Sequence, residues 1–414
     1  MSWQELTLGS AIHVKHGFAF KGEFFSDQGA HIVLTPGNFN EEGGFRVRPE
    51  KDRAYIGDIP EAFVLDQGDL IVAMTEQGAG LLGSAALVPK SNRYLHNQRL
   101  GLIDRIDTSL LDKRFLYLLF NTREVRAQIS GSASGIKVRH TAPERLYRVR
   151  SKVPDVKTQA SIADVALSYD DLIESNRRRM ALLEESARLL YREWFVRLRF
   201  PGYEHTPIVD GVPQGWRKVS LSSVASKIGS GATPRGGEAA YQTEGVTLIR
   251  SMNVYDDLFN DDGLAFLNDH QADGLANVVV EPLDILLNII GASVARCCMA
   301  PERYLPARVD QHVMIIRVDP EKASPFIVHK AINSDECKRQ LLSFARKGST
   351  REALTKDEVA RFEIRIPKRP IMERFDEVAS DSFRQRGVLA RQNQKLRAAR
   401  DLLLPRLMSG EVTV

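Results

Sequence analysis

The side chains of this chain that could bind a ligand or react are mainly amide and basic groups, which lie at strand ends and in Gly-rich loops. Arg and Lys can bind phosphate or pair bidentately with guanine, and Asn and Gln can pair with adenine. The candidates in the first half, one of them aromatic, are Phe20, Lys21, Gln77, Asn97, Gln98, Arg99, Lys137, Arg139 and His140. The candidates in the second half are Arg235, Arg250, Asn288, Arg296, Gln311, His312, Lys347 and Arg351. Any one alone is more simply interpreted as a solvated loop residue, but the set favours a nucleic-acid surface.

Motifs for nucleotide, metal or methyl-group chemistry are missing from the sequence. It has no G-x-x-x-x-G-K-[ST] phosphate loop, no H-E-x-x-H or paired Cys/His spacing, and no Asn-Pro-Pro-aromatic segment. The Gly-rich segments at Gly131 and Gly229 do not follow a strand and open a helix, so we interpret them as loops. The cysteines, Cys297, Cys298 and Cys337, contain no C-x-x-C pair. We therefore expect no catalytic residue, no metal site and no cofactor bound by this chain.

Length and charge limit the class of protein. With 414 residues the chain is long enough for two domains joined by helices. Lys and Arg number 57 against 53 Asp and Glu, so the net charge is only +4. This charge permits a nucleic-acid partner only where basic side chains cluster. The N-terminal MSWQELTLGS lacks a signal-peptide core, and no segment is apolar enough to span a membrane. We expect a cytoplasmic protein that does not associate with membranes.

The sequence contains two related halves. Trp3 and Gln98 recur as Trp216 and Gln311, because 216 − 3 and 311 − 98 both equal 213. In both halves short strands alternate with Gly-, Asn- and Pro-rich turns, which is typical of a mixed α/β domain. A helix is expected over residues 113–128. Asn38 and Asn253, each at the end of a strand, are expected to stabilise a turn. The halves therefore share a scaffold, while their loops differ.

A long amphipathic helix follows the first half. Over residues 157–196 one set of positions, called the seam below, recurs in alternating steps of four and three residues. This is the heptad pattern of a helix that needs a partner helix. This seam consists of Ile162, Ala166, Tyr169, Ile173, Asn176, Met180, Leu183, Ala187, Leu190 and Trp194. The corresponding C-terminal seam consists of Phe375, Ala379, Ser382, Arg386, Leu389, Asn393, Leu396, Arg400, Leu403 and Leu407. We expect the two helices to pair, unevenly at Arg386 and Arg400.

Four segments give the sequence a family resemblance. GFAFK near the N-terminus, LLYREWFV, VPQGW followed by GSGATP, and the C-terminal LLLPRLMSGEV resemble recurring segments of the specificity subunit of type I restriction-modification systems. The resemblance covers essentially the whole chain. It implies two target recognition domains, each reading one half of a split site in double-stranded DNA.

The resemblance also implies a fold and a set of partners. The expected fold class is α/β (mixed α+β), with two pseudo-repeated recognition domains separated by two long antiparallel coiled-coil helices. The expected boundaries are residues 1–156 and 216–368 for the recognition domains, 157–200 and 369–414 for the helices, and 201–215 for the linker. Two modification subunits would dock on the helices, with Trp194, Phe195, Leu403 and Leu407 as expected docking residues. S-adenosylmethionine, ATP and Mg²⁺ would be bound by the modification and the restriction/translocase subunits.

The helix length gives a further expectation about the DNA site. About 40 residues at roughly 1.5 Å per residue make a helix of about 60 Å, longer than one DNA turn of about 34 Å. Two pseudo-symmetric domains with different loops predict a bipartite, asymmetric site, and the helix length sets its unread spacer. Two hypotheses of other classes remain open: an enzyme with its own methyltransferase or nuclease activity, and a scaffold without a role on DNA.

Overall fold

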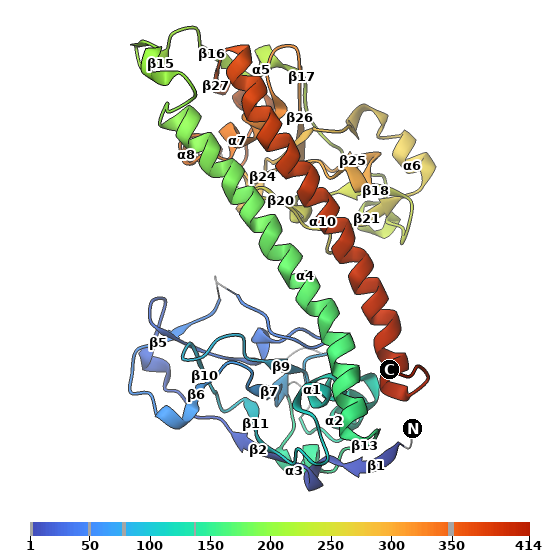
Figure 1. Ribbon diagram of the computed structural model, residues 1–414. Helices are drawn as coiled ribbons and strands as arrows, with labels where there is room; N and C mark the ends of the chain where they lie inside the picture. Colours follow the sequence, from blue (N-terminus) through green and yellow to red (C-terminus); the bar gives the residue numbers. More distant parts are fainter. Residues whose placement is uncertain (1–2, 49–50, 77–79, 136–137, 347–351) are drawn as a thin grey trace. The chain divides into compact units, whose positions relative to one another are not determined.

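The chain forms two compact units, each with a globular α/β part and a stretch of both long helices. The computed structural model describes residues 3–48, 51–76, 80–135, 138–346 and 352–414. Unit 1 consists of Met1–Leu172 with Leu396–Val414, and unit 2 of Ile173–Lys395. The long helices are α4 (Val156–Tyr191) and α10 (Arg369–Ser409) (Figure 1). This confirms the expected mixed α/β class with a long central and a long C-terminal helix.

Two sheets form the globular part of unit 1. The four-stranded antiparallel sheet has the order β2-β11-β7-β9, formed by Ile12–His16, Leu100–Ile106, Leu70–Ala73 and Ala85–Leu87. The second sheet has the order β3-β5-β4-β10-β6, formed by Phe25–Ser26, Ala54–Tyr55, His31–Val33, Tyr94–Leu95 and Val64–Leu65. Strands β4 and β10 are parallel. Every residue of β7 is buried, as expected for a strand covered on both faces.

Unit 2 repeats this topology. Its four-stranded sheet has the order β17-β26-β23-β24, formed by Ala225–Ser230, Val313–Val318, Ile285–Asn288 and Cys297–Met299. Its second sheet has the order β21-β18-β25-β22, formed by Ala265–Leu267, Val246–Ile249, Ala307–Val309 and Val279–Val280. Strands β18 and β25 form its parallel pair, as β4 and β10 do in unit 1. The duplication expected from the sequence is therefore present in the fold.

Short pairings complete each globular part. The first strand of each half pairs antiparallel with the last: β1 (Gln4–Thr7) with β13 (Arg150–Val153), and β16 (Arg217–Ser220) with β27 (Glu363–Ile366). The remaining strands are β8 (Thr75–Glu76), β12 (Arg139–His140), β14 (Ile208–Val209), β15 (Val212–Pro213), β19 (Val254–Tyr255) and β20 (Leu258–Phe259). The shorter helices are α1 (Lys113–Phe120), α2 (Arg123–Gly131), α3 (Pro143–Tyr147), α5 (Leu221–Val224), α6 (Asp269–Asp273), α7 (Pro325–Ile332), α8 (Asp335–Ala345) and α9 (Lys356–Arg361).

The single helix expected over residues 113–128 is wrong, because α1 and α2 are separate. The Asn121 side chain turns back to β9, where its Oδ1 accepts from the Ala85 N–H at 3.0 Å. Thr122 then caps α2, its hydroxyl accepting from the Val125 N–H. Unit 2 has the same break between α7 and α8, where Ser334 is the cap.

The two strand-end asparagines stabilise turns, as expected. Both are fully buried. Asn38 Oδ1 accepts from the Thr35 N–H at 2.9 Å, and Asn253 Oδ1 accepts from the Arg250 N–H at 3.0 Å. Each therefore closes the 3₁₀ turn that follows its strand.

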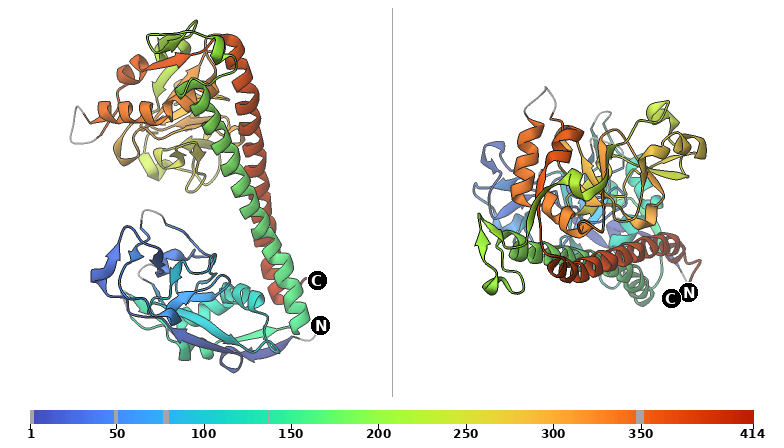
Figure 2. Two further views of the ribbon diagram at one scale, coloured as in Figure 1. Left: turned by 60° about the vertical axis from the view of Figure 1, so that its left-hand side comes forward. Right: turned by 90° about the horizontal axis from the view of Figure 1, so that it is seen from above.

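Within each unit the stretches of α4 and α10 lie side by side (Figures 1 and 2). In unit 2, Asn176 Nδ2 donates to Asn393 Oδ1 at 2.9 Å, and Glu184 pairs with Arg386. The residue number falls along α10 as it rises along α4, so the helices are antiparallel. Most seam positions named above are buried, including Ile162, Ala166, Ile173, Ala187, Phe375, Ala379, Ser382, Leu389 and Leu407. Among the described residues, no helix is long and apolar enough to cross a bilayer.

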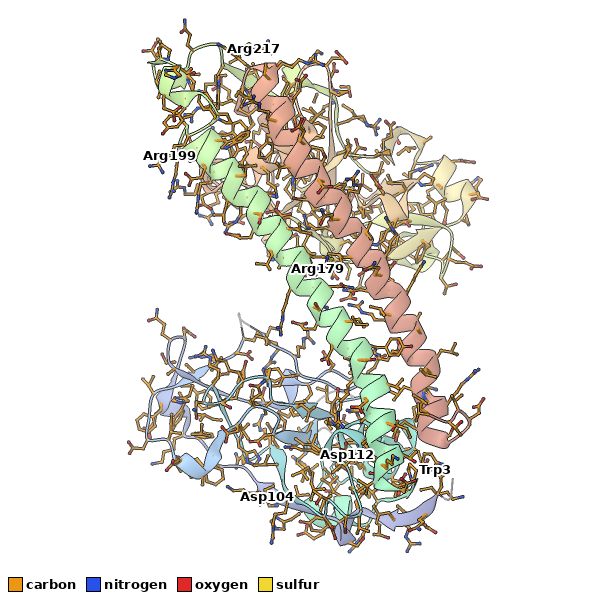
Figure 3. The ribbon with its side chains drawn as sticks, viewed as in Figure 1. Trp3, Asp104, Asp112, Arg179, Arg199 and Arg217 are labelled. Atoms are coloured by element: carbon orange, nitrogen blue, oxygen red, sulfur yellow. The ribbon has the colours of Figure 1, made fainter. Side chains whose placement is uncertain are left out.

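Unit 1 joins its globular part to α4 through a cap. The Asp112 side chain accepts from the first N–H groups of α1. Its own N–H donates to Oε1 of Gln159, a buried residue of α4, at 2.9 Å; Asp112 is labelled in Figure 3. In the seam of this unit, Arg400 pairs with Asp170 at 2.5 Å. The seam arginines are thus neutralised by carboxylates of α4, which makes the pair uneven as expected.

The buried asparagine pair yields a prediction about stability. Asn176→Ala should lower the free energy of unfolding by about 1–3 kcal/mol, because a buried polar partner is left unsatisfied. The double variant Asn176→Leu/Asn393→Leu should be close to neutral, because neither polar group remains. Denaturant unfolding would measure both, with the exposed Ser175→Ala on the same helix as control. A double variant that loses as much stability as Asn176→Ala, or more, would contradict this account.

Candidate nucleic-acid interface

A backbone junction at the end of β7 brings two of the candidate segments of unit 1 together. The Met74 N–H donates to the Arg99 carbonyl at 3.0 Å, and the Met74 carbonyl accepts from the Thr141 N–H at 2.9 Å. Strand β12, which includes His140, pairs with β8 immediately after this residue. Arg99 and His140 therefore lie at the same strand end, although 41 positions separate them (140 − 99).

Asn97, Gln98 and Arg99 form a tight turn between β10 and β11, called turn 1 below. Asn97 Oδ1 accepts from the Arg99 N–H at 3.4 Å. Gln98 and Arg99 are exposed and Asn97 is half-buried. The Phe18 backbone pairs with this turn, since its carbonyl accepts from the Gln98 N–H at 3.0 Å. The GFAFK segment is thereby fixed against turn 1.

The aromatic residues of that segment serve the fold. The Phe20 ring packs against Tyr55 with 4.8 Å between centroids and against Phe18 with 5.1 Å. Phe20 is half-buried and engaged by these rings, whereas Lys21 is exposed. Of these two candidates, Lys21 is the one available to a ligand.

Arg139 is also engaged inside unit 1. Its Nη1 lies 3.3 Å from Oε1 of Glu76, a carboxylate that is 3% exposed, and its Nη2 donates to the Ser130 carbonyl. Glu76 Oε2 accepts in turn from the Leu81 and Leu82 N–H groups. The Arg139 guanidinium is therefore engaged by Glu76 and Ser130, while the neighbouring His140 is exposed. The candidates Gln77 and Lys137 lie outside the described residues.

Unit 2 has the corresponding turn, formed by Asp310, Gln311 and His312 and called turn 2 below. The Ile289 N–H, just after β23, donates to the His312 carbonyl at 3.0 Å, and the Ile289 carbonyl accepts from the Leu354 N–H at 2.8 Å. Asp310 Oδ1 accepts from the His312 N–H at 2.9 Å. Gln311 is exposed, His312 is half-buried and Asp310 is buried.

Two basic side chains lie near a buried carboxyl group at turn 2. Burial raises the pKa of Asp310, and the neighbouring His312 and Arg250 oppose that rise. His312 Nδ1 lies 3.7 Å from Asp310 Oδ2. Arg250 is held by the Gly263 carbonyl at 2.5 Å and lies over the Tyr241 ring at 5.2 Å. These contacts place Arg250 and His312 around one carboxyl group.

The other candidates of unit 2 are scattered. Asn288 is fully buried, and its Nδ2 donates to the Ser251 and Val254 carbonyls, so it has a structural task and the proposed interface excludes it. Arg296 lies over the Tyr255 ring at 4.7 Å. Arg235 is exposed in the loop after β17. The candidates Lys347 and Arg351 lie outside the described residues.

The four expected docking residues lie in or against the cores. Phe195 is 3% exposed and packs against Phe375 and Trp216, with centroids 5.1 and 5.6 Å away. Leu407 is 1% exposed in the core of unit 1. Trp194 and Leu403 are partly buried against the same two cores. All four side chains thus stabilise the units.

A set of exposed apolar residues on α4 and its last turn was missed by the sequence reasoning. Leu182, Leu189 and Val196 are 67%, 38% and 46% exposed. Leu182 and Leu189, seven residues apart on α4, lie on one helix face, and Val196 ends the π-helical turn Arg192–Val196 that follows. The signal was available as a second heptad phase beside the buried seam. The sequence does not single it out, because the buried seam already accounts for most apolar positions of this helix.

The described residues contain no group of three or more His, Cys, Asp or Glu side chains placed to hold a metal ion. What the two turns offer is hydrogen bonding. Gln, Arg and His side chains are presented on short, backbone-fixed turns, as direct readout of base edges requires.

Comparison with known proteins gives relatives that match 72% of this chain. No family model matches the chain. It is 22% identical over 311 residues to the type I restriction enzyme MjaIX specificity subunit of Methanocaldococcus jannaschii, covering 72% of this chain and 69% of that protein. It is 23% identical over 358 residues to the type I restriction enzyme HindI specificity subunit of Haemophilus influenzae, covering 72% and 76%.

A solved structure shows the same fold. The type I restriction-modification S subunit of M. genitalium matches with a TM-score of 0.61 at 13% identity, covering 98% of this chain and 96% of that one. Together, these findings confirm the resemblance to type I specificity subunits.

His96, which precedes turn 1, yields a prediction about pH. It is fully buried, its Nε2 lies 3.0 Å from the Leu100 carbonyl, and burial lowers its pKa to about 4. The unfolded chain therefore takes up this proton at higher pH than the folded chain does. The associated stability is present above pH 6.5, the ordinary pKa, and is lost as pH falls towards 4.

Between pH 7 and pH 4.5 this group should account for a loss of roughly 2–3 kcal/mol. His96→Gln can still donate to the Leu100 carbonyl and has no such proton to bind. Hydrogen exchange of the unit 1 sheet amides should therefore depend less steeply on pH in the variant. Identical pH dependence in both proteins would show that His96 is not the group responsible.

Proposed function

We propose that this chain is a non-catalytic DNA-specificity subunit of a type I restriction-modification complex. The observation that carries the proposal is the repeated strand-end turn, which presents amide and basic side chains on equivalent scaffolds with different loops. The similarity of this chain to type I specificity subunits supports a role in DNA recognition. Two readers with different loops suit a bipartite, asymmetric site in double-stranded DNA.

The chemistry of modification and cleavage is assigned to partner chains. We expect two modification subunits to bind S-adenosylmethionine, and restriction/translocase subunits to bind ATP and Mg²⁺. This division agrees with the missing cofactor and target-base motifs of the sequence. The proposed place of action is the cytoplasm.

The proposed docking surface is the apolar row Leu182, Leu189 and Val196 of unit 2. Its side chains are exposed, and Leu182 and Leu189 have the seven-residue spacing of an α-helix face suited to another apolar surface. Phe195, by contrast, is buried in the core of unit 2. We therefore assign docking to the solvent side of α4 and not to the core residues expected from the sequence, two of which, Leu403 and Leu407, belong to α10.

The function is tested by methyl transfer in trans. The purified chain, incubated with DNA and labelled S-adenosylmethionine, should transfer no methyl group alone. The same chain with modification subunits should methylate DNA at a bipartite sequence, because it supplies specificity and they supply catalysis. Sequencing of methylated positions with and without the chain measures this. Methyl transfer by the chain alone would sink the proposal, and assembly without any DNA binding would favour the scaffold hypothesis.

The docking surface is tested by Leu182→Asp/Leu189→Asp. A charge at each position should weaken binding of the modification subunit by tenfold or more, because burying an unpaired carboxylate is unfavourable. Ala181→Asp is the matched control, since Ala181 is exposed on the same helix about 100° from the row. Ultracentrifugation would measure association, and circular dichroism would check the fold. Equal binding by the double variant and the control would rule out this surface.

A further inference from the structure

We infer that turn 1 and turn 2 are equivalent base-reading elements, in which Gln98 and Gln311 make the shared contact while Arg99 and His312 distinguish the two half-sites. The inference rests on the proposed function. The 213-residue offset pairs these positions in the sequence, and the backbone contacts of each turn give them a common role.

The backbone establishes the equivalence. In each unit one residue after a fully buried strand, Met74 or Ile289, donates to the third residue of the turn. The carbonyl of that same residue accepts from a second loop, at Thr141 in unit 1 and at Leu354 in unit 2. In each unit, therefore, one strand-end residue holds the turn through its N–H and the second loop through its carbonyl.

A glycine on the neighbouring segment confirms the match. A Cβ on Gly17 would lie 2.0 Å from the Asn97 carbonyl oxygen, and a Cβ on Gly231 would lie 1.8 Å from the Val309 carbonyl oxygen. No side chain fits at either position. Both turns are thus backed by a segment at closest backbone approach, which limits how far they can move on binding.

The first residue of each turn has the same task with a different charge. Asn97 Oδ1 and Asp310 Oδ1 each accept from the N–H two residues later. This fold of the turn directs the second and third residues outward, and the glutamine in the second position is exposed in both. The side-chain amide of glutamine can donate and accept at once, as adenine N6 and N7 require. We assign Gln98 and Gln311 to an adenine at the corresponding position of each half-site.

The third position differs in hydrogen-bonding capacity. Arg99 is exposed, and among the described residues its guanidinium makes no ion pair. It can present two parallel donors to O6 and N7 of guanine. His312 has one ring nitrogen near Asp310 and the other 3.4 Å from Gln311 Nε2, so it cannot present that pair of donors. The first half-site should therefore require a guanine where the second does not.

The test uses the complete complex of this chain with modification subunits. Methylated positions are mapped on DNA libraries in which each half-site is randomised in turn. Arg99→His should reduce the preference for one guanine in the first half-site about tenfold or more and leave the second unchanged. Asp310→Asn/His312→Arg reproduces turn 1 in unit 2 and should create a guanine preference in the second half-site alone. The aspartate is replaced as well because its carboxylate would otherwise pair with the new arginine.

The controls separate this inference from the proposed function. Arg105→His changes an exposed arginine of β11 outside the turn and should leave both half-sites unchanged. Assembly with the modification subunits, measured for every variant, shows whether each one folds. If the wild-type complex methylates a bipartite site and the turn variants read it unchanged, the inference fails and the function stands. If Arg105→His has the same effect as Arg99→His, the inference also fails. A wild-type complex without sequence preference would overturn the proposed function itself.

Discussion

The structure depends on the apolar seams of α4 and α10, which neither helix could bury alone. In unit 1 Ile162, Ala166 and Leu407 belong to the same core as the sheet. In unit 2 Phe195 and Phe375 do the same. Each globular part is thus completed by the helix pair and is not an independent domain hung on a rod. Loops far from the seam can then diverge without threatening the fold.

Polar contacts give the pairing a defined register. An apolar seam tolerates sliding, but the buried Asn176 and Asn393 have partners in only one alignment. Unit 2 adds a buried charge cluster, in which Glu184 of α4 pairs with both Arg386 of α10 and Lys330 of α7. Asp257, in the turn between β19 and β20, also pairs with Lys330. This cluster fixes the helices to the globular part of unit 2, because displacing any member leaves an unpaired buried charge.

The sequence predicted the structural features whose residues recur with a fixed period or offset. The heptad seam and the 213-residue duplication are properties of many residues at once, so they survive individual substitutions. Burial of a single polar side chain depends on neighbours distant in the sequence, and there prediction failed. Asn288 and Arg139 have the residue types of base readers, yet buried carbonyls engage the first and Glu76 the second. Phe20 and Phe195 likewise looked available, because their aromatic partners come from other segments.

The two turns combine one backbone arrangement with different side chains. The constraints on the backbone, a strand-end hydrogen bond and a glycine without room for a Cβ, are the same in both units. The side chains are not independent of each other, however. Asp310 is buried beside Arg250 and His312, so a basic side chain in turn 2 is attracted to its carboxyl group. Asn97 has no charge, so Arg99 stays free of such a partner. On the proposed function, a new guanine contact in turn 2 therefore requires Asp310 and His312 to change together, whereas loss of the contact in turn 1 requires only Arg99 to change.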